Sequence, residues 1–244
     1  MAIMKALVLA AGRSTRIAAV SAGRPKPLLE IAGESILGRN LGWLSEFGVH
    51  DVWINLHHQP HEIQQAIDDG TRFGVRVRYS LEDELLGTAG AVQNLAEVWD
   101  ETLLVVYGDN LVRFNLDELL QFHRSKGNAV SIAVFHRTRN LNTGIAGGRV
   151  RISTDNRIED FREGANDDFS PFVNAGVYVI QRDVVSQIPS KRPCDFARDV
   201  FPQLLAENVA LYGYPIDGFC LGIDNPESYY RAIEFIENGK VVLS

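Results

Sequence analysis

Short apolar runs alternate with helical patterns along the first half of the chain, and this alternation most limits the fold. The segments between the runs have the spacing of amphipathic helices, and two of them end at glycines: Ser35–Phe47, Pro60–Asp68 and Thr88–Val98. The apolar runs read as strands bounded by turn residues: Lys5–Ala10, Asp51–Leu56, Val75–Tyr79 and Thr102–Val106. This order predicts an α/β fold, a mostly parallel sheet with helices on both faces.

The second half of the chain, from about residue 129, is less regular. It contains two further strand patterns, a hairpin pattern and two helical patterns: Ala129–Phe135, Phe172–Ile180, Arg149–Phe161, Asp195–Ala206 and Pro226–Asn238. The chain contains no internal repeat, linker or low-complexity tract. We therefore expect a single domain, 1–244, made of two halves, about 1–128 and 129–244.

The bulk composition is that of a soluble globular protein, with 45% apolar and 23% charged residues among 244. The start of the chain enters a strand pattern at once, and no apolar run approaches the ~20 residues that span a bilayer. The two cysteines suit a reducing compartment, so a cytoplasmic location is expected. The net charge of −7 excludes a general basic field for nucleic acid, and no membrane contact is expected. An anionic ligand therefore needs local cations.

Such cations follow the first strand pattern. The strand leads into a turn of small residues at Gly12, where the absence of a Cβ lets backbone N–H groups approach phosphate oxygens. Arg16 adds a forked guanidinium, and Lys26 adds an ammonium between two prolines that restrict the backbone. An ordinary strand-to-helix turn is the simpler interpretation, but both elements at this spacing predict a phosphate site.

These residues resemble the signature of the sugar-1-phosphate nucleotidylyltransferases, L-A-[AG]-G-x-G-[ST]-R-[LM] followed by P-K-P-[LM]. The chain has Ser14 where that family usually has Gly, and the Ser14 hydroxyl offers a donor for a phosphate. The resemblance extends from Lys5 to Tyr230. It implies the Rossmann-like nucleotide-diphospho-sugar transferase fold, with a small β-hairpin insertion on the sugar side. It also implies a nucleotide-binding first half and a sugar-binding second half.

The resemblance implies specific nucleotide contacts. The segment that begins at Gly87 resembles the family motif L-G-T-A-G-[AS], which lines the base and ribose; a helix start that needs small residues is the plainer interpretation. The expected nucleotide-binding residues are Leu9, Ala10, Ala11, Gly12, Ser14, Thr15, Gly87, Thr88, Ala89 and Gly108. Arg16 and Lys26 are the expected catalytic residues: Arg16 would hold the departing pyrophosphate and Lys26 the α-phosphate.

Two carboxylates are the expected metal ligands, and Mg²⁺ is the expected cofactor. Asp109 follows a buried strand pattern next to a glycine, a position suited to Mg²⁺, which binds one or two carboxylates together with phosphates. The family's second metal carboxylate has its counterpart at Gly222, and Asp224 stands two residues later. Residues two apart in extended chain point to the same side, so Asp224 is the expected second ligand. Asp224 as a cap of the following helix is the alternative.

The sugar-side motifs match the family in part. Asn174 lies in a match to the family's N-A-G-[IV]-Y strand, whose Asn binds sugar hydroxyls, and Gly144 matches a backbone approach to the sugar. Glu163 matches the sugar-binding carboxylate, but Gly164 replaces the Lys that usually neutralises the sugar phosphate. Arg162 or a neighbouring arginine is the candidate to replace that Lys.

The resemblance implies the reaction of an NTP with a sugar 1-phosphate to give an NDP-sugar and pyrophosphate. The short form is similar to mannose- or heptose-1-phosphate guanylyltransferases and muramate-1-phosphate uridylyltransferases, so GTP is expected first and UTP second. The expected partners are these two substrates, and a homo-oligomer is left open.

Two other function classes remain. A regulatory paralogue that binds an NDP-sugar without making it is suggested by Gly164 and by the displaced Asp224. A metal-dependent glycosyltransferase needs a D-x-D motif after the fourth strand, where this chain has Tyr107-Gly108-Asp109-Asn110. His57, His58 and His61 suggest a zinc cluster, but they fall in a strand-to-helix loop and an ordinary loop is favoured.

Overall fold

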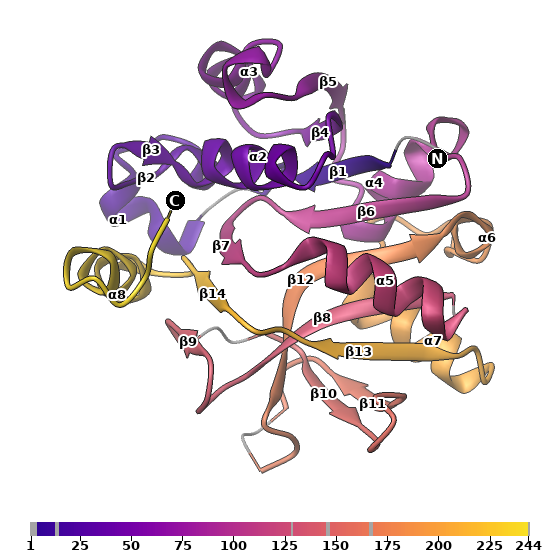
Figure 1. Ribbon diagram of the computed structural model, residues 1–244. Coiled ribbons are helices and arrows are strands. Elements are labelled where there is room, and N and C mark those ends of the chain that lie inside the picture. Colours follow the sequence, from indigo (N-terminus) through magenta and orange to yellow (C-terminus); the bar gives the residue numbers. More distant parts are fainter. Residues whose placement is uncertain (1–3, 13–14, 128, 145–146, 166–167, 244) are drawn as a thin grey trace.

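A nine-stranded sheet forms the centre of the protein (Figure 1). The computed structural model describes residues 4–12, 15–127, 129–144, 147–165 and 168–243. Seven strands follow one another across the sheet in the order β11-β10-β12-β6-β1-β4-β5, and β8 and β13 join it through β12. These strands are β1 (Lys5–Leu9), β4 (Asp51–Leu56), β5 (Arg76–Leu81), β6 (Thr102–Tyr107), β8 (Val130–His136), β10 (Arg149–Ile152), β11 (Ile158–Arg162), β12 (Phe172–Gln181) and β13 (Leu211–Pro215).

The strands of the first half are parallel, as predicted. Strand β1 pairs in parallel with both β4 and β6, and β4 pairs in parallel with β5. The carboxyl ends of these strands therefore lie at one edge of the sheet, where ligands bind in open α/β sheets. The predicted fold class is confirmed.

The second half extends the same sheet with antiparallel strands. Strand β12 pairs antiparallel with β6 on one side and with β8 on the other, and β10 and β11 form the predicted hairpin. Two small sheets were not predicted: β7-β14-β9 and β2-β3. Their strands are β2 (Glu30–Ile31), β3 (Glu34–Ser35), β7 (Asn110–Arg113), β9 (Leu141–Asn142) and β14 (Phe219–Gly222). These short pairings depend on contacts between distant segments and leave little periodicity in the sequence.

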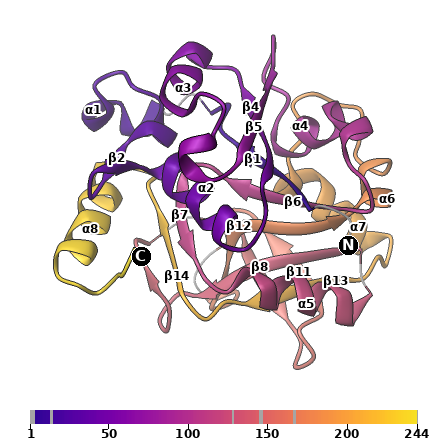
Figure 2. The same ribbon diagram turned by 45° about the horizontal axis from the view of Figure 1, so that its top comes forward.

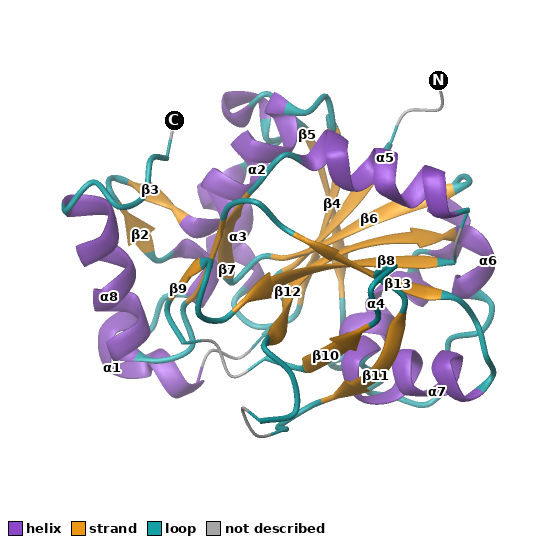
Figure 3. Ribbon diagram, turned by 60° about the horizontal axis from the view of Figure 1, so that its bottom comes forward, coloured by secondary structure: helices purple, strands orange, loops and turns teal. Residues whose placement is uncertain are grey.

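Helices cover both faces of the sheet (Figures 1 and 3). One core cluster joins the sheet to α2, α3 and α5, and a second joins it to α4, α6 and α7. A third cluster packs α8 against the small sheets, and Figure 2 shows α8 beside β2. The helices are α1 (Ala18–Ser21), α2 (Ile36–Glu46), α3 (Pro60–Ile67), α4 (Thr88–Asn94), α5 (Leu116–Lys126), α6 (Arg182–Val185), α7 (Phe201–Ala206) and α8 (Pro226–Glu237).

Successive residues of a strand point to opposite faces of the sheet, so each buried strand contributes side chains to both main core clusters. In β1, Ala6 and Val8 face the first cluster and Leu7 faces the second, and all three are fully buried. Strands that are buried on both faces read as continuous apolar runs, which explains the pattern of the first half.

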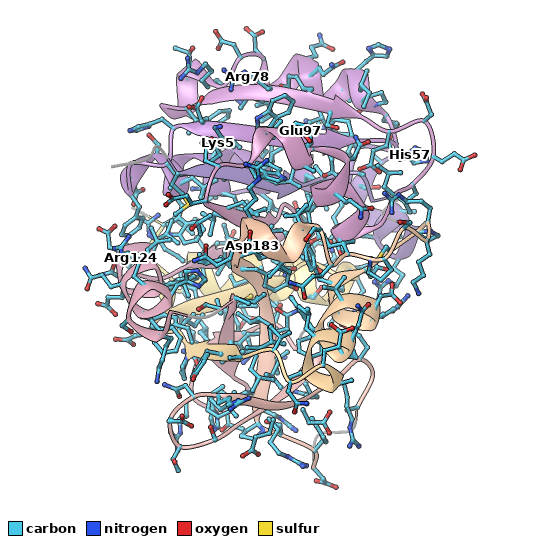
Figure 4. All side chains as sticks on the ribbon, turned by 90° about the vertical axis from the view of Figure 1, so that its right-hand side faces the viewer. Lys5, His57, Arg78, Glu97, Arg124 and Asp183 are labelled. Atoms are coloured by element: carbon cyan, nitrogen blue, oxygen red, sulfur yellow. The ribbon has the colours of Figure 1, made fainter. Side chains whose placement is uncertain are left out.

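The helix boundaries differ in detail from the prediction. Helix α4 ends at Asn94 and a separate 3-10 turn follows, while the pattern from Asp195 begins with a turn of π-helix, Phe196–Val200, before α7. None of the helices in the described part of the chain combines the length and apolar character that a membrane span requires. Side chains of both halves are shown in Figure 4, with Lys5, Arg78 and Arg124 from the first half and Asp183 from the second.

Candidate active site

A cavity of about 360 Å³ opens at the carboxyl ends of β1, β4 and β6. It brings together residues from segments that are far apart in the sequence, including most of the predicted nucleotide residues. Its lining is Leu9, Ala10, Ala11, Gly12, Arg16, Ile17, Lys26, Pro27, Asn55, Leu85, Gly87, Thr88, Tyr107, Asp109, Asp195 and Asp224.

Not every predicted nucleotide residue lines this cavity. Ala89 is a residue of α4 and is fully buried in the second core cluster. Gly108 is outside the lining of the cavity, and its N–H donates to the Leu9 carbonyl at 2.9 Å. A Cβ at this position would lie 2.8 Å from the same oxygen. Gly108 therefore allows β1 and the end of β6 to approach closely. Ser14 and the side chain of Thr15 lie outside the part of the chain that the structure describes.

Lys26 lies between the two predicted metal carboxylates. Its ammonium donates to Asp109 Oδ2 at 2.7 Å and to Asp224 Oδ1 at 3.1 Å, and its side chain is 8% exposed. Burial lowers the pKa of Lys26, but attraction to both carboxylates and the hydrogen bonds to them outweigh it and raise that pKa. Lys26 is thus held as a cation.

The two carboxylates come from different parts of the fold. Asp109 lies between β6 and β7, and Asp224 lies between β14 and α8. The side chain that caps α8 is Asn225, which accepts a hydrogen bond from Ser228 N–H in a capping box. The alternative in which Asp224 serves as that cap is therefore wrong.

A buried polar chain fixes two walls of the cavity relative to each other. Asn55 Oδ1 accepts from the Ala10 N–H at 2.9 Å, and its amide donates to Glu82 Oε1 at 2.8 Å. Glu82 Oε2 accepts from the Leu86 N–H at 3.0 Å. The turn after β1 is thereby joined to the loop before α4. In the sequence, Asn55 falls at the end of the strand pattern Asp51–Leu56, and a polar residue at a strand end was its only signal.

A segment of the second half caps the N-terminus of α4. Asp195 Oδ1 accepts from Thr88 N–H at 3.1 Å and from the Thr88 hydroxyl at 3.2 Å. The Cys194 carbonyl accepts from the N–H groups of Ala89 and Gly90 at 2.9 and 3.1 Å. These bonds satisfy donors that a helix start leaves without intrahelical partners. Asp195 lines the cavity, yet its sequence signal suggested only a helix start.

A second cavity of about 180 Å³ adjoins the first. Two predicted sugar residues, Asn174 and Glu163, line it, whereas Gly144 is exposed and outside its lining. Asn174 is held in place, because its amide donates to the Tyr178 hydroxyl at 2.7 Å and its Oδ1 accepts from Gly176 N–H at 2.9 Å. The lining is Arg16, Tyr107, Asp109, Asn110, Gly147, Gly148, Glu163, Asn174, Gly176 and Asp224.

The surroundings of Glu163 show which arginines lie near the position of the missing lysine. Arg162 is engaged elsewhere: it pairs with Asp160 at 2.6 Å and lies over the Phe169 ring. Burial raises the pKa of Glu163, the nearby positive charge of Arg198 opposes this, and the negative charge of Asp195 adds to it. Arg198, on the turn before α7, is therefore the cation whose charge reaches Glu163.

The two cavities share Arg16, Tyr107, Asp109 and Asp224. The shared Tyr107 is partly buried, and desolvation of its ring raises its pKa to about 12, so it remains a neutral hydrogen-bonding group. Arg16 and the two carboxylates carry charge at the junction. Ligands in the two cavities would thus meet at one guanidinium and two carboxylates.

The carboxylate pair fits a magnesium ion that also binds phosphates. Mg²⁺ prefers oxygen ligands and usually takes one or two protein carboxylates, completing its shell with waters and substrate oxygens. Asp109 and Asp224 reach the same ammonium and are close enough to share a cation. Over the described ranges, no three His, Cys, Asp or Glu side chains are grouped to hold a metal by themselves. His57 hydrogen-bonds the Glu82 carbonyl and lies on the parallel half (Figure 4).

The parallel strands and the cavity at their carboxyl ends place the chain among the open-sheet α/β proteins, whose ligand sites lie at that edge of the sheet. The chain belongs to the Nucleotidyl transferase family, whose model matches residues 5–239. The family resemblance is therefore confirmed.

Two curated relatives illustrate the similarity. The chain is 31% identical to the mannose-1-phosphate guanylyltransferase of Mycobacterium tuberculosis, over 93% of this chain and 62% of that protein. It is 29% identical to the UTP–glucose-1-phosphate uridylyltransferase of a Synechocystis strain, over 94% of this chain and 62% of that protein. The chain thus spans about 62% of the length of these relatives.

Solved structures share the fold. HddC from Yersinia pseudotuberculosis matches with a TM-score of 0.80 and 21% identity, over 96% of this chain and 99% of that one. A putative glucose-1-phosphate thymidylyltransferase from Bacillus anthracis matches with a TM-score of 0.81 and 19% identity, over 95% and 94%. At these identities the likeness concerns the fold alone.

Proposed function

We propose that the protein transfers a nucleotidyl group from an NTP to a sugar 1-phosphate and releases pyrophosphate. The observation that carries this proposal is that the two cavities share Arg16, Asp109 and Asp224. An NTP in the first cavity and a sugar phosphate in the second would meet at these charged groups. Membership of the Nucleotidyl transferase family supports the same reaction.

The proposed step is one in-line displacement. A phosphate oxygen of the sugar 1-phosphate attacks the α-phosphorus of the NTP, the bond to the bridging α–β oxygen breaks, and pyrophosphate leaves with that electron pair. Because the attacking phosphate is already an anion, the step needs no general base. Catalysis then consists of positioning and charge neutralisation. Arg16 would hold the departing pyrophosphate, and Lys26 the α-phosphate.

Asp109 and Asp224 are the proposed Mg²⁺ ligands. Held by these carboxylates, Mg²⁺ would act as a Lewis acid that neutralises phosphate charge. The fold positions both carboxylates at the junction of the cavities, with Asp109 after β6 and Asp224 before α8.

For the nucleotide we propose GTP first and UTP second. Several relatives carry the name mannose-1-phosphate guanylyltransferase, among them the most identical of those described above, and one is named for UTP and glucose 1-phosphate. The first cavity presents Leu85, Gly87 and Thr88 on the wall that would border the base. Both cysteines are free thiols, which supports a cytoplasmic location.

For the sugar we propose a neutral hexose 1-phosphate. Among the described residues, the second cavity has three carboxylates in its lining, Asp109, Asp224 and Glu163, and one cation, Arg16. A second negative group on the sugar ring would be repelled by Glu163, whereas hydroxyls can hydrogen-bond to it. Mannose and glucose 1-phosphates therefore rank ahead of a sugar acid such as muramate 1-phosphate.

The test is pyrophosphate release from each of four NTPs paired with a panel of sugar 1-phosphates. We expect release with GTP and mannose 1-phosphate or a close hexose analogue, and less with muramate 1-phosphate. Release that is fastest with an acidic sugar would contradict the sugar assignment. No release with any pair would contradict the transferase proposal.

One observation favours a second candidate, a regulatory protein that binds an NDP-sugar. Gly164 stands where the family has a phosphate-binding lysine, and no atom of the described residues lies within 4 Å of where its Cβ would be. Tight binding of GDP-mannose without pyrophosphate release would favour this candidate. The retained Arg16, Lys26 and Asp109 favour the enzyme, since a pure binder needs no site for a leaving pyrophosphate.

A further inference from the structure

Lys26 occupies the position where the two proposed metal ligands converge. Its ammonium contacts one oxygen of each carboxylate, Asp109 Oδ2 at 2.7 Å and Asp224 Oδ1 at 3.1 Å. A divalent cation that used both carboxylates would need the same oxygens or their immediate neighbours. The ammonium and the cation thus compete for one place.

Hydrogen bonds of the turn fix the Lys26 backbone, and the long side chain reaches from this turn to the two carboxylates. Pro25 precedes the turn, and the N–H groups of Leu28 and Leu29 donate to the carbonyls of Pro25 and Lys26 at 2.9 and 3.0 Å. The lysine side chain is a flexible chain of four carbons, so rotation about its bonds can move the ammonium away from the carboxylates without movement of this turn. Lys26 also lines the first cavity beside Gly12 and Arg16, and phosphate oxygens there would offer it new partners.

We propose that Lys26 is a built-in counter-cation that keeps divalent metal out of the carboxylate pair until nucleotide phosphates draw the ammonium away. This inference rests on the proposed function, which assigns Asp109 and Asp224 to the metal. Two adjacent carboxylates repel each other unless a cation lies between them, and the ammonium supplies that charge in the nucleotide-free protein. The metal therefore enters with the nucleotide rather than before it, and the empty enzyme has a low affinity for free metal.

Arg16 offers a matched control. It lines both cavities, as the two carboxylates do, but among the described residues it makes no hydrogen bond or ion pair with either of them. Removal of Arg16 takes away a positive charge from the same region without vacating the position between the carboxylates.

The experiment is a Mn²⁺ titration of the nucleotide-free full chain, read by the paramagnetic resonance signal of free Mn²⁺. We expect Lys26→Gln to bind Mn²⁺ at least about tenfold more tightly than the unmodified protein, because the competing charge is gone. Arg16→Gln should change the affinity by less than about threefold. Lys26→Met is a second variant of similar length, and circular dichroism checks that all of them fold.

The outcomes separate the inference from the proposed function. Tighter binding in Lys26→Gln that is lost when Asp109→Asn is added supports the inference. Asp109-dependent binding that is equally tight with and without Lys26 overturns the inference and leaves the metal site standing. No Asp109-dependent binding in Lys26→Gln, even with GTP present, overturns both. An equal gain in Arg16→Gln and Lys26→Gln also overturns the inference, because only general charge would then matter.

Discussion

At the scale of single residues, the site is organised around charges that neutralise one another. Lys26 is 8% exposed, and Asp109 and Asp224 are the partners that hold it as a cation. A buried charge without partners is costly, so each of the three groups depends on the others. The same ammonium that stabilises the empty site is the one proposed to meet the α-phosphate.

Replacement of Lys26 should therefore affect turnover and metal binding in opposite directions. Lys26→Met is expected to lower kcat for pyrophosphate release by roughly a hundredfold or more, since one preorganised charge at the reacting phosphate is lost. Metal affinity should rise in the same variant. The measurements are steady-state kinetics at saturating Mg²⁺ and the Mn²⁺ titration. Unchanged turnover would refute the assignment of Lys26 to the α-phosphate.

At the scale of elements, the two halves of the chain meet at the start of α4. The segment around Asp195 belongs to the second half, yet it accepts from the first N–H groups of α4, beginning with Thr88. The fit is close, because a Cβ on Gly87 would collide with the Cys194 backbone. One wall of the first cavity is therefore positioned by a segment from the second half.

Asp195→Ala should weaken this junction. Loss of the cap is expected to cost about 1 kcal/mol of stability and to raise KM for the NTP several-fold, with a smaller change in kcat. Asp195→Asn keeps an oxygen acceptor for Thr88 and should restore both values. Thermal unfolding and kinetics with varied NTP check this. A KM for the NTP that is the same in Asp195→Ala as in the unmodified protein would show that the cap does not position the wall.

At the scale of the whole molecule, both halves share one sheet, and its core contains an uncharged histidine. His123 on α5 is 2% exposed, with Nδ1 at 3.0 Å from the Ser131 hydroxyl and Nε2 at 3.0 Å from the Gln181 amide nitrogen. The amide donates to Nε2, so the ring proton lies on Nδ1. Burial, with a contribution from Arg124, lowers the pKa of His123 to about 4.

This histidine predicts acid sensitivity. In the unfolded chain His123 takes up a proton near pH 6.5, whereas in the folded chain it does so only near pH 4. Its contribution to stability is therefore complete above about pH 6.5 and is lost as the pH falls towards 4. Between pH 7 and 5 the unmodified protein should lose up to about 2 kcal/mol more than His123→Gln. Urea unfolding at both pH values measures this, and an equal loss in both proteins would contradict it.

The sequence predicted the parallel half well because three of its four strands, β1, β4 and β6, are buried on both faces. Ala6, Leu7 and Val8 supply both core clusters, so local apolar runs alone reveal the strand. The short strands β7, β9 and β14 were missed because each pairs with a partner that is distant in the chain. Asn55 and Asp195 were missed as site residues for the same reason, since their partners are Ala10, Glu82 and Thr88.

The sequence alone is enough to predict the α/β class, the small-residue turn after β1, and most of the charged residues that line the cavity. These follow from local patterns: apolar periodicity, a glycine where the backbone must approach a ligand, and cations near it. It took the tertiary structure to show that Lys26 bridges Asp109 and Asp224 and that Asp195 caps α4. Lys26 and Asp224 are 198 positions apart, and no local pattern encodes which strand ends a sheet brings together.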